Sequence, residues 1–256
     1  MDIGTRTPFL DSFKRGDAAR EIRMLAATGS LAPRACEQVE LLLLLREDPD
    51  AEVAATAEKT LGGLSPASVA GFLARSEASP EAQAYFAARG ITPAAAPNGD
   101  ADLPLIETDS DEPPAAAEER EASTLQRLAG LSIAKRISVA MKGTREERAI
   151  LIRDPNRIVT AAVLSSPKMT DTEIAGIARM ANVSEDVLRT IAHNRAWLKN
   201  YSVALGLVKN PKTPVALSMN LLSRLNDKDL RMLSSDRNVP DVLRVTARKK
   251  IVIGGG

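Results

Sequence analysis

Aromatic residues are scarce in this sequence of 256 residues, in which Phe, Tyr and Trp together make up 3%. Stacking surfaces for nucleobases and the cores of many β-sandwiches depend on aromatic side chains. Small and aliphatic residues are plentiful instead, and they suit close-packed short helices. The composition therefore favours an all-α protein and argues against an aromatic-rich β-sandwich.

Cysteine and histidine occur once each, as Cys36 and His193. One thiol cannot form an internal disulfide, and zinc sites of the usual composition need several Cys or His ligands. Cys36 lies among Ala, Val and Leu, so we expect a core residue and not a reactive thiol. His193 precedes Asn194, and we expect a helix end whose carbonyl groups the imidazole satisfies, without a catalytic role.

Long apolar runs, a secretory signal pattern and glycine-rich phosphate loops are also missing. The longest apolar run, residues 41–45, is far shorter than the roughly 20 residues that span a bilayer. The Gly-x-x-x-x-Gly-Lys pattern is absent. We therefore expect a soluble cytoplasmic protein that is not an enzyme, and we assign no catalytic, cofactor-binding or metal-binding residue and no cofactor.

What the sequence does contain is an internal repeat. Residues 159–168 and 203–212 match at an offset of 44, which pairs Lys168 with Lys212. Arginines also recur 42 residues apart, at Arg153, Arg195 and Arg237, and the last of them introduces a truncated third copy. A period of this length, built from short helices and turns with proline, is typical of a helical solenoid.

Charge divides the chain into three parts. Residues 1–91 carry a net charge of −3, residues 92–122 carry −8 and residues 123–256 carry +12. The middle segment is rich in Pro and acidic residues, and it cannot offset an ordering cost of about 1 to 2 kcal/mol per residue. We predict an N-terminal HEAT-like domain (1–91), a disordered acidic linker (92–122) and a basic C-terminal helical-repeat domain (123–256). The linker is expected to fold back on the basic domain as an electrostatic shield.

Helices are predicted throughout both ordered domains, and no strand is predicted. Apolar periodicity favours helices over 17–28, opened by Asp17, and over 33–46, and Leu-rich residues 41–45 are the expected centre of the first domain. Capping residues and prolines predict further helix starts. These starts lie at Asp50, Ser65, Ser79, Ser132, Thr144, Pro155, Thr170, Ser184, Trp197, Pro214, Asp227 and Pro240.

The turns carry a resemblance to known repeat families. Residues 154–156, 166–168 and 210–214 (Asp-Pro-Asn, Ser-Pro-Lys and Asn-Pro-Lys-Thr-Pro), spaced between Ala-, Val- and Leu-rich helices, resemble those of bacterial HEAT-like repeats and the leucine-rich-repeat variant. Residues 48–57 look like a HEAT-type unit. The resemblance implies a HEAT/armadillo-like solenoid, a right-handed superhelix that binds other macromolecules, and it transfers no catalytic residue.

The candidate binding residues are cations of the C-terminal domain, several of which recur at equivalent repeat positions and should form rows along a solenoid. They are Lys168, Arg189, Arg195, Lys212, Arg231, Arg237, Arg244, Arg248, Lys249 and Lys250. These rows could keep the protein soluble, contact an acidic protein, or neutralise nucleic-acid phosphates. We predict a non-catalytic scaffold or adaptor for another protein, with nucleic-acid binding as the alternative. The extra cations of 248–250 also look like the polar outer face of a terminal repeat.

Overall fold

A computed structural model describes residues 7–32, 34–75, 78–95, 105 and 120–254, and its regular elements are all helices. No strand occurs in these residues, which confirms the all-α prediction. The chain forms two compact units. Unit 1 comprises Met1–Glu147 and Asn156–Pro167, and unit 2 comprises Arg148–Pro155 and Lys168–Gly256. No helix in the described residues has the length and apolar composition that a membrane crossing requires.

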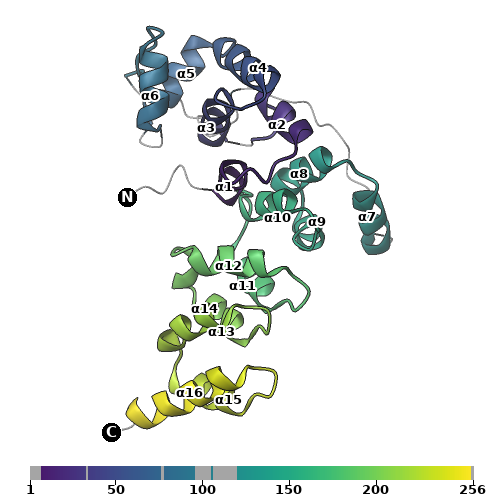
Figure 1. Ribbon diagram of the computed structural model, residues 1–256, viewed down its shortest axis with the longest axis vertical. Helices are drawn as coiled ribbons and strands as arrows, with labels where there is room; N and C mark the ends of the chain where they lie inside the picture. Colours follow the sequence, from purple (N-terminus) through teal and green to yellow (C-terminus); the bar gives the residue numbers. More distant parts are fainter. Residues whose placement is uncertain (1–6, 33, 76–77, 96–104, 106–119, 255–256) are drawn as a thin grey trace. The chain divides into compact units, whose positions relative to one another are not determined.

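Unit 1 holds the first eight helices and a tenth (Figure 1), and α9 (Arg145–Leu151) straddles the two units. The helices of unit 1 are α1 (Pro8–Lys14), α2 (Arg20–Ala27), α3 (Ala35–Leu45), α4 (Ala51–Gly62), α5 (Pro66–Leu73), α6 (Pro80–Ala87), α7 (Arg120–Ala129), α8 (Ile133–Lys142) and α10 (Arg157–Leu164).

Helix α3 is the centre of the N-terminal half of unit 1, as its Leu-rich sequence predicts. It is buried on nearly every side and packs against α1, α2, α4 and α6. Cys36 is buried within it, as expected of a core residue. Gln38 is buried as well, and its amide donates to the carbonyl oxygen of Gly29 at 2.7 Å. A buried amide needs such partners because an unpaired one costs about 1 to 3 kcal/mol.

Helix α1 was not predicted, although its start follows the same rule as others in the chain. Thr7 caps it and Pro8 occupies its first turn, and Phe9 is fully buried. The helix packs on α3 and on α10, and the N–H of Phe9 donates to Oγ of Ser165 at 3.0 Å. Unit 1 therefore joins residues from both sides of segment 92–122, and this division of the chain differs from the two domains and linker expected from charge.

The acidic linker predicted at 92–122 lies largely outside the described residues. At its start, the N–H of Ala94 donates to the carbonyl oxygen of Ala70 in α5 at 2.9 Å. Farther along, the N–H of Leu105 donates to the side-chain oxygen of Gln38 in α3 at 2.7 Å. These two described points of the segment are thus bonded to helices of unit 1.

Unit 2 holds the remaining helices. They are α11 (Asp171–Arg179), α12 (Glu185–His193), the 3₁₀ helix η1 (Trp197–Lys199), α13 (Tyr201–Lys209), α14 (Val215–Leu221), the 3₁₀ helix η2 (Leu222–Arg224), α15 (Asp227–Ser235) and α16 (Asp241–Gly254). In this unit α11 packs on α13, α14 contacts α16, and α15 packs closely on α16.

Helix caps largely follow the sequence rules. Asp50 caps α4 through the N–H groups of Glu52 and Val53, and Thr170 and Glu173 form the predicted capping box of α11. The cap predicted at Asp17 is wrong. Helix α2 begins after Ala19, whose side chain cannot accept a hydrogen bond, and Asp17, two residues earlier, pairs with Arg15 at 3.0 Å.

The repeated turn is anchored by matching side chains. Asn210, directly before the second turn, donates through Nδ2 to the carbonyl oxygens of Ala178 and Met180 in unit 2, both at 2.9 Å. Ser166, its equivalent at the offset of 44, donates through Oγ to the carbonyl oxygen of Met141 in unit 1 at 2.8 Å. Both side chains are buried, so each turn is tied to the end of an earlier helix.

Candidate functional site

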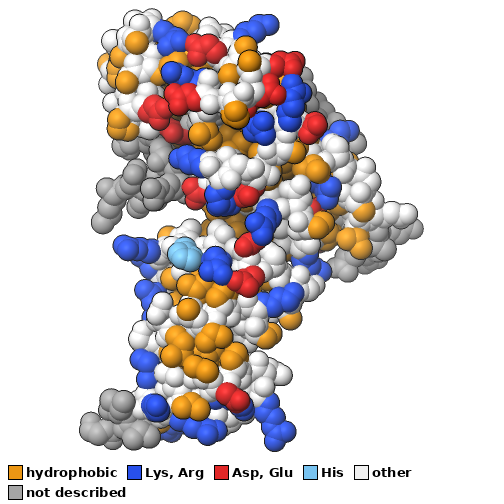
Figure 2. Space-filling model, in the orientation of Figure 1, with side chains coloured by type: hydrophobic (Ala, Val, Ile, Leu, Met, Phe, Trp, Pro, Cys, Tyr) orange, Lys and Arg blue, Asp and Glu red, His pale blue; other side chains and the backbone are white. Residues whose placement is uncertain are grey.

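The ten predicted cations all belong to unit 2, whose sequence holds 17 Lys and Arg against 9 Asp and Glu, a net charge of +8. Eight of the ten side chains are exposed, and Arg244 and Lys250 are half-buried. On the face shown in Figure 2, red and blue side chains mix over α2–α4, whereas blue and orange predominate over α13–α16. Unit 2 thus carries +8 of the net charge of +12 in residues 123–256, and all ten candidate cations.

Several of these cations already have partners within the unit. Arg189 forms an ion pair with Glu185, and Arg244 forms one with Asp241. Lys212 Nζ donates to the carbonyl oxygen of Val183 at 3.2 Å. Arg248 donates to the carbonyl oxygen of Ser234 at 3.0 Å, close to the end of α15. These contacts give some of the basic side chains a structural role.

Other cations form no ion pair with any described residue of the chain. They are Arg195, Arg231, Arg237, Lys249 and Lys250. Arg195 and Arg237 follow the last residues of α12 and α15 at matching places, after Asn194 and Asp236. Asn194 accepts from the N–H of Ala196 and Asp236 from that of Asn238, at 2.9 and 3.0 Å. The same local turn therefore presents both arginines, and their alignment in a row stays a prediction.

Exposed apolar side chains are the feature that the sequence analysis missed. Five of the six large apolar side chains exposed in the described residues lie in unit 2, and the sixth, Leu125, lies in unit 1. The five are Tyr201, Val215, Met232, Val242 and Val245. The sequence could have predicted two of them, because helical periodicity places Val242 and Val245 away from the side of α16 that is buried. That side holds Leu243 and Ala247. The outer face of α16 is thus partly apolar, unlike the polar face expected of a terminal repeat.

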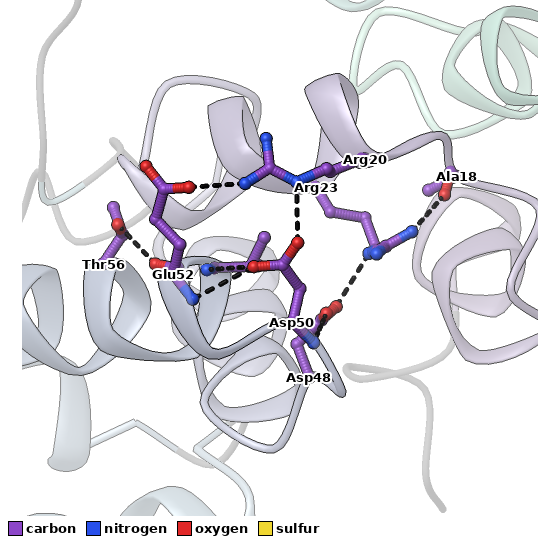
Figure 3. A network of polar contacts seen from close by, with 8 residues as sticks. Ala18, Arg20, Arg23, Asp48, Asp50, Glu52 and Thr56 are labelled. Carbon is purple, nitrogen blue, oxygen red and sulfur yellow. Dashed lines mark hydrogen bonds and ion pairs between the residues drawn. The ribbon is translucent and has the colours of Figure 1, made fainter.

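A network of polar contacts in unit 1 joins two helices (Figure 3). Arg20 of α2 reaches the carboxylates of Asp50, at 2.6 Å, and Glu52, at 2.5 Å, at the start of α4. Arg23 reaches Asp48 at 2.8 Å and the carbonyl oxygen of Ala18 at 2.9 Å. The hydrogen bond from Arg20 holds the pKa of Asp50 below its ordinary value, and Asp50 in turn raises the pKa of Arg20. The network ties α2 to the turn before α4.

A buried ion pair in unit 2 has the same kind of role. Arg148 of α9 donates to one oxygen of Glu173 in α11 at 2.7 and 3.2 Å, and the exposed fractions of these residues are 5% and 9%. Burial raises the pKa of Glu173, but hydrogen bonds from Arg148 and Thr170 lower it by more, so the pKa lies below its ordinary value. The carboxylate is fully engaged and is not available to a substrate.

The single histidine occupies the expected place. His193 is the last residue of α12, and its Nδ1 lies 2.7 Å from the carbonyl oxygen of Arg189 one turn earlier. In the residues that the structure describes, no cluster of three or more His, Cys, Asp or Glu side chains is placed to hold a metal ion.

Comparisons of this chain with protein-family models, with curated proteins and with solved structures found no match. The resemblance to helical repeats therefore rests on residues of the sequence, and it stays a prediction.

Proposed function

We propose that this protein is a non-catalytic helical-repeat scaffold or adaptor that binds another protein through unit 2. The observation that carries the proposal is the coincidence, in one unit, of a net charge of +8 with five of the six exposed large apolar side chains. Protein interfaces combine apolar anchors with a polar rim. A surface that only keeps a protein soluble needs the charges alone.

Helix packing supports the repeat character of this proposal. The third helix of a triplet packs back on the first in α2–α4 and α8–α10, and α11 to α13 and α14 to α16 repeat this arrangement. Stacked units of this kind are how HEAT and armadillo solenoids bury a continuous core.

The buried thiol of Cys36 supports a cytoplasmic location, where thiols stay reduced.

Site-specific photo-crosslinking in the cells that make the protein tests the function. A photoreactive residue replaces Arg237 or Lys249 in unit 2, and the exposed Glu81 in unit 1 serves as the matched control position. We expect discrete protein adducts from the two unit 2 positions that resist nuclease, and none from the control. Adducts that nuclease removes, or equal labelling from all three positions, would contradict protein binding by unit 2.

Nucleic-acid binding is the second candidate, and the matching exposures of Arg195 and Arg237 favour it. Each neutralised phosphate of duplex DNA lowers log K by about 0.9 per log unit of salt. We would titrate the full chain against a mixed-sequence duplex at about 50 and 200 mM salt by fluorescence anisotropy. Tight, salt-steep binding whose slope falls by about one in Arg237→Ala would favour this candidate. Absence of binding at the lower salt would exclude it.

A further inference from the structure

Helix α16, at the end of unit 2 (Figure 1), buries one side and leaves an apolar stripe on the other. Leu243 and Ala247 are buried in the contact with α15 and α14, while the exposed fractions of Val242 and Val245 are 58% and 47%. Residues three and four apart in a helix lie on one side. Lys249, four residues after Val245, is exposed and continues the same stripe.

Three of the four acidic residues in 226–254 are already engaged, and the fourth, Asp227, lies in the first turn of α15. Asp241 pairs with Arg244, and Asp229 accepts a hydrogen bond from the hydroxyl of Tyr201. Asp236 accepts from the backbone N–H of Asn238. Four cations of this region are not neutralised in the same way, since they form no ion pair with a described residue. They are Arg231, Arg237, Lys249 and Lys250. The surface of α15 and α16 thus combines exposed valines with uncompensated positive charge.

From this we infer that the exposed side of α16 is the docking surface for an acidic amphipathic helix of a partner protein. The inference rests on the proposed function and gives the partner its chemistry. Apolar side chains of the partner would cover Val242 and Val245, and a carboxylate would meet Lys249. Duplex DNA fits this surface less well, because its phosphates can use the cations but leave both valines in water.

The spacing along α16 defines the partner's pattern. Val242 and Lys249 are seven residues apart, which at 1.5 Å per residue is about 10 Å along the helix axis. Acidic residues are favoured at the N-terminus of a helix, and antiparallel helices oppose their dipoles favourably. A partner helix running antiparallel to α16 therefore carries an acid, then apolar residues four and seven positions later: acid-x-x-x-apolar-x-x-apolar.

A display selection tests this pattern. A library of helical peptides of about 16 residues, roughly 24 Å long, is selected against the full chain and counter-selected against the triple variant Val242→Ser/Val245→Ser/Lys249→Glu. We expect enrichment of the acid-x-x-x-apolar-x-x-apolar pattern. Enrichment of peptides that bind the triple variant equally well, or of apolar peptides without acids, would overturn the inference.

Titration of the enriched peptide against variants of the full chain, followed by fluorescence anisotropy, then shows whether the peptide binds at α16. Val242→Ser/Val245→Ser should weaken binding at least about tenfold, because each valine loses its apolar contact. Val215→Ser, which changes an exposed valine of α14, is the matched control and should change binding less than about twofold. Circular dichroism checks that both variants stay folded.

Charge reversal supplies an independent test. Lys249→Glu should weaken binding of the acidic peptide about tenfold. A peptide with Lys in place of its acid should bind this variant with the lost affinity restored. Loss of binding in Val215→Ser, but not in the α16 variants, would overturn the α16 surface and leave protein binding by unit 2 intact. Failure of the crosslinking experiment at Arg237 and Lys249 would instead contradict the proposed function itself.

Discussion

At the scale of single residues, the buried pair Arg148–Glu173 makes unit 2 sensitive to substitution. Both side chains are buried, and each holds the other's charge. Removing one partner of a buried pair leaves an uncompensated charge and costs about 3 to 5 kcal/mol, whereas replacing both with apolar residues is often neutral. Arg148→Met should therefore destabilise unit 2 by that amount, and Arg148→Met/Glu173→Leu should recover part of the loss, since Leu also removes the capping bond of Glu173 with Thr170.

The measurement is chemical denaturation followed by tryptophan fluorescence. Trp197 is the only tryptophan and lies in unit 2, so its emission reports on that unit. Arg20→Met, which breaks the exposed network of unit 1, is the control and should leave the tryptophan transition in place. A double variant as unstable as Arg148→Met would show that the pair does not act through its charge.

The same pair predicts how acid affects unit 2. The pKa of Glu173 is lower in the folded protein than its ordinary value of about 4.3. Its contribution to stability is therefore complete above that value and is lost as the pH falls through the lower folded pKa. In tryptophan-monitored denaturation, the stability difference between the wild type and Glu173→Gln should be constant above about pH 5 and shrink below about pH 4. A difference that stays constant down to about pH 3 would contradict this assignment.

At the scale of elements, two glycines in packed helices make opposite predictions. A Cβ added to Gly206 in α13 would meet Cβ of Ala178 and Cγ of Arg179 in unit 2, both at 3.1 Å, whereas one added to Gly176 in α11 would meet nothing within 4 Å. Gly206→Ala should destabilise unit 2 by about 1 kcal/mol, since Ala178 lies on a packed helix and cannot yield. Gly176→Ala should stabilise it by about 0.5 to 1 kcal/mol through helix propensity. Tryptophan-monitored denaturation of both variants gives the two signs, and equal signs would contradict the close approach of α11 and α13.

Helix existence was predictable because its causes are local. Capping residues such as Asp50 and Thr170 act within three residues of the chain, and the sequence shows them directly. The prediction at Asp17 was wrong because the cap position of α2 falls two residues later, on Ala19, while Asp17 pairs with Arg15. The exposure of Val242 was not predicted, although it lies off the face of α16 that holds the buried Leu243. Exposure depends on which side a neighbouring helix covers, and a single helix does not record that.

At the scale of the whole molecule, the division into units was beyond the reach of sequence patterns. Net charge suggested a boundary at 92–122, but the contact of Phe9 with Ser165 joins residues that are 156 positions apart. No periodicity connects two such sites, because the contact depends on tertiary packing. The gathering of the ten candidate cations in a single basic unit could be foreseen, since charge composition is additive along the chain.

Two units with separate cores should respond separately to core mutations. Phe9 is fully buried in unit 1, and truncating a buried phenylalanine costs about 3 to 5 kcal/mol. Phe9→Ala should lower the unfolding midpoint measured by far-ultraviolet circular dichroism, which reports on every helix, and leave the Trp197 transition unchanged. Movement of both transitions together would show that the units unfold as one.

The docking of α1 on α10 also sets an order of events during synthesis. Phe9 leaves the ribosome long before Ser165 is made, and translation at about 5 to 20 residues per second separates the two by roughly 8 to 30 seconds. During that interval α1, which carries Phe9 and Phe13, can pack on α3 but lacks its contact with α10. The nascent chain therefore carries an aromatic, aggregation-prone segment until α10 emerges, and it is at this stage that a chaperone would have most to protect.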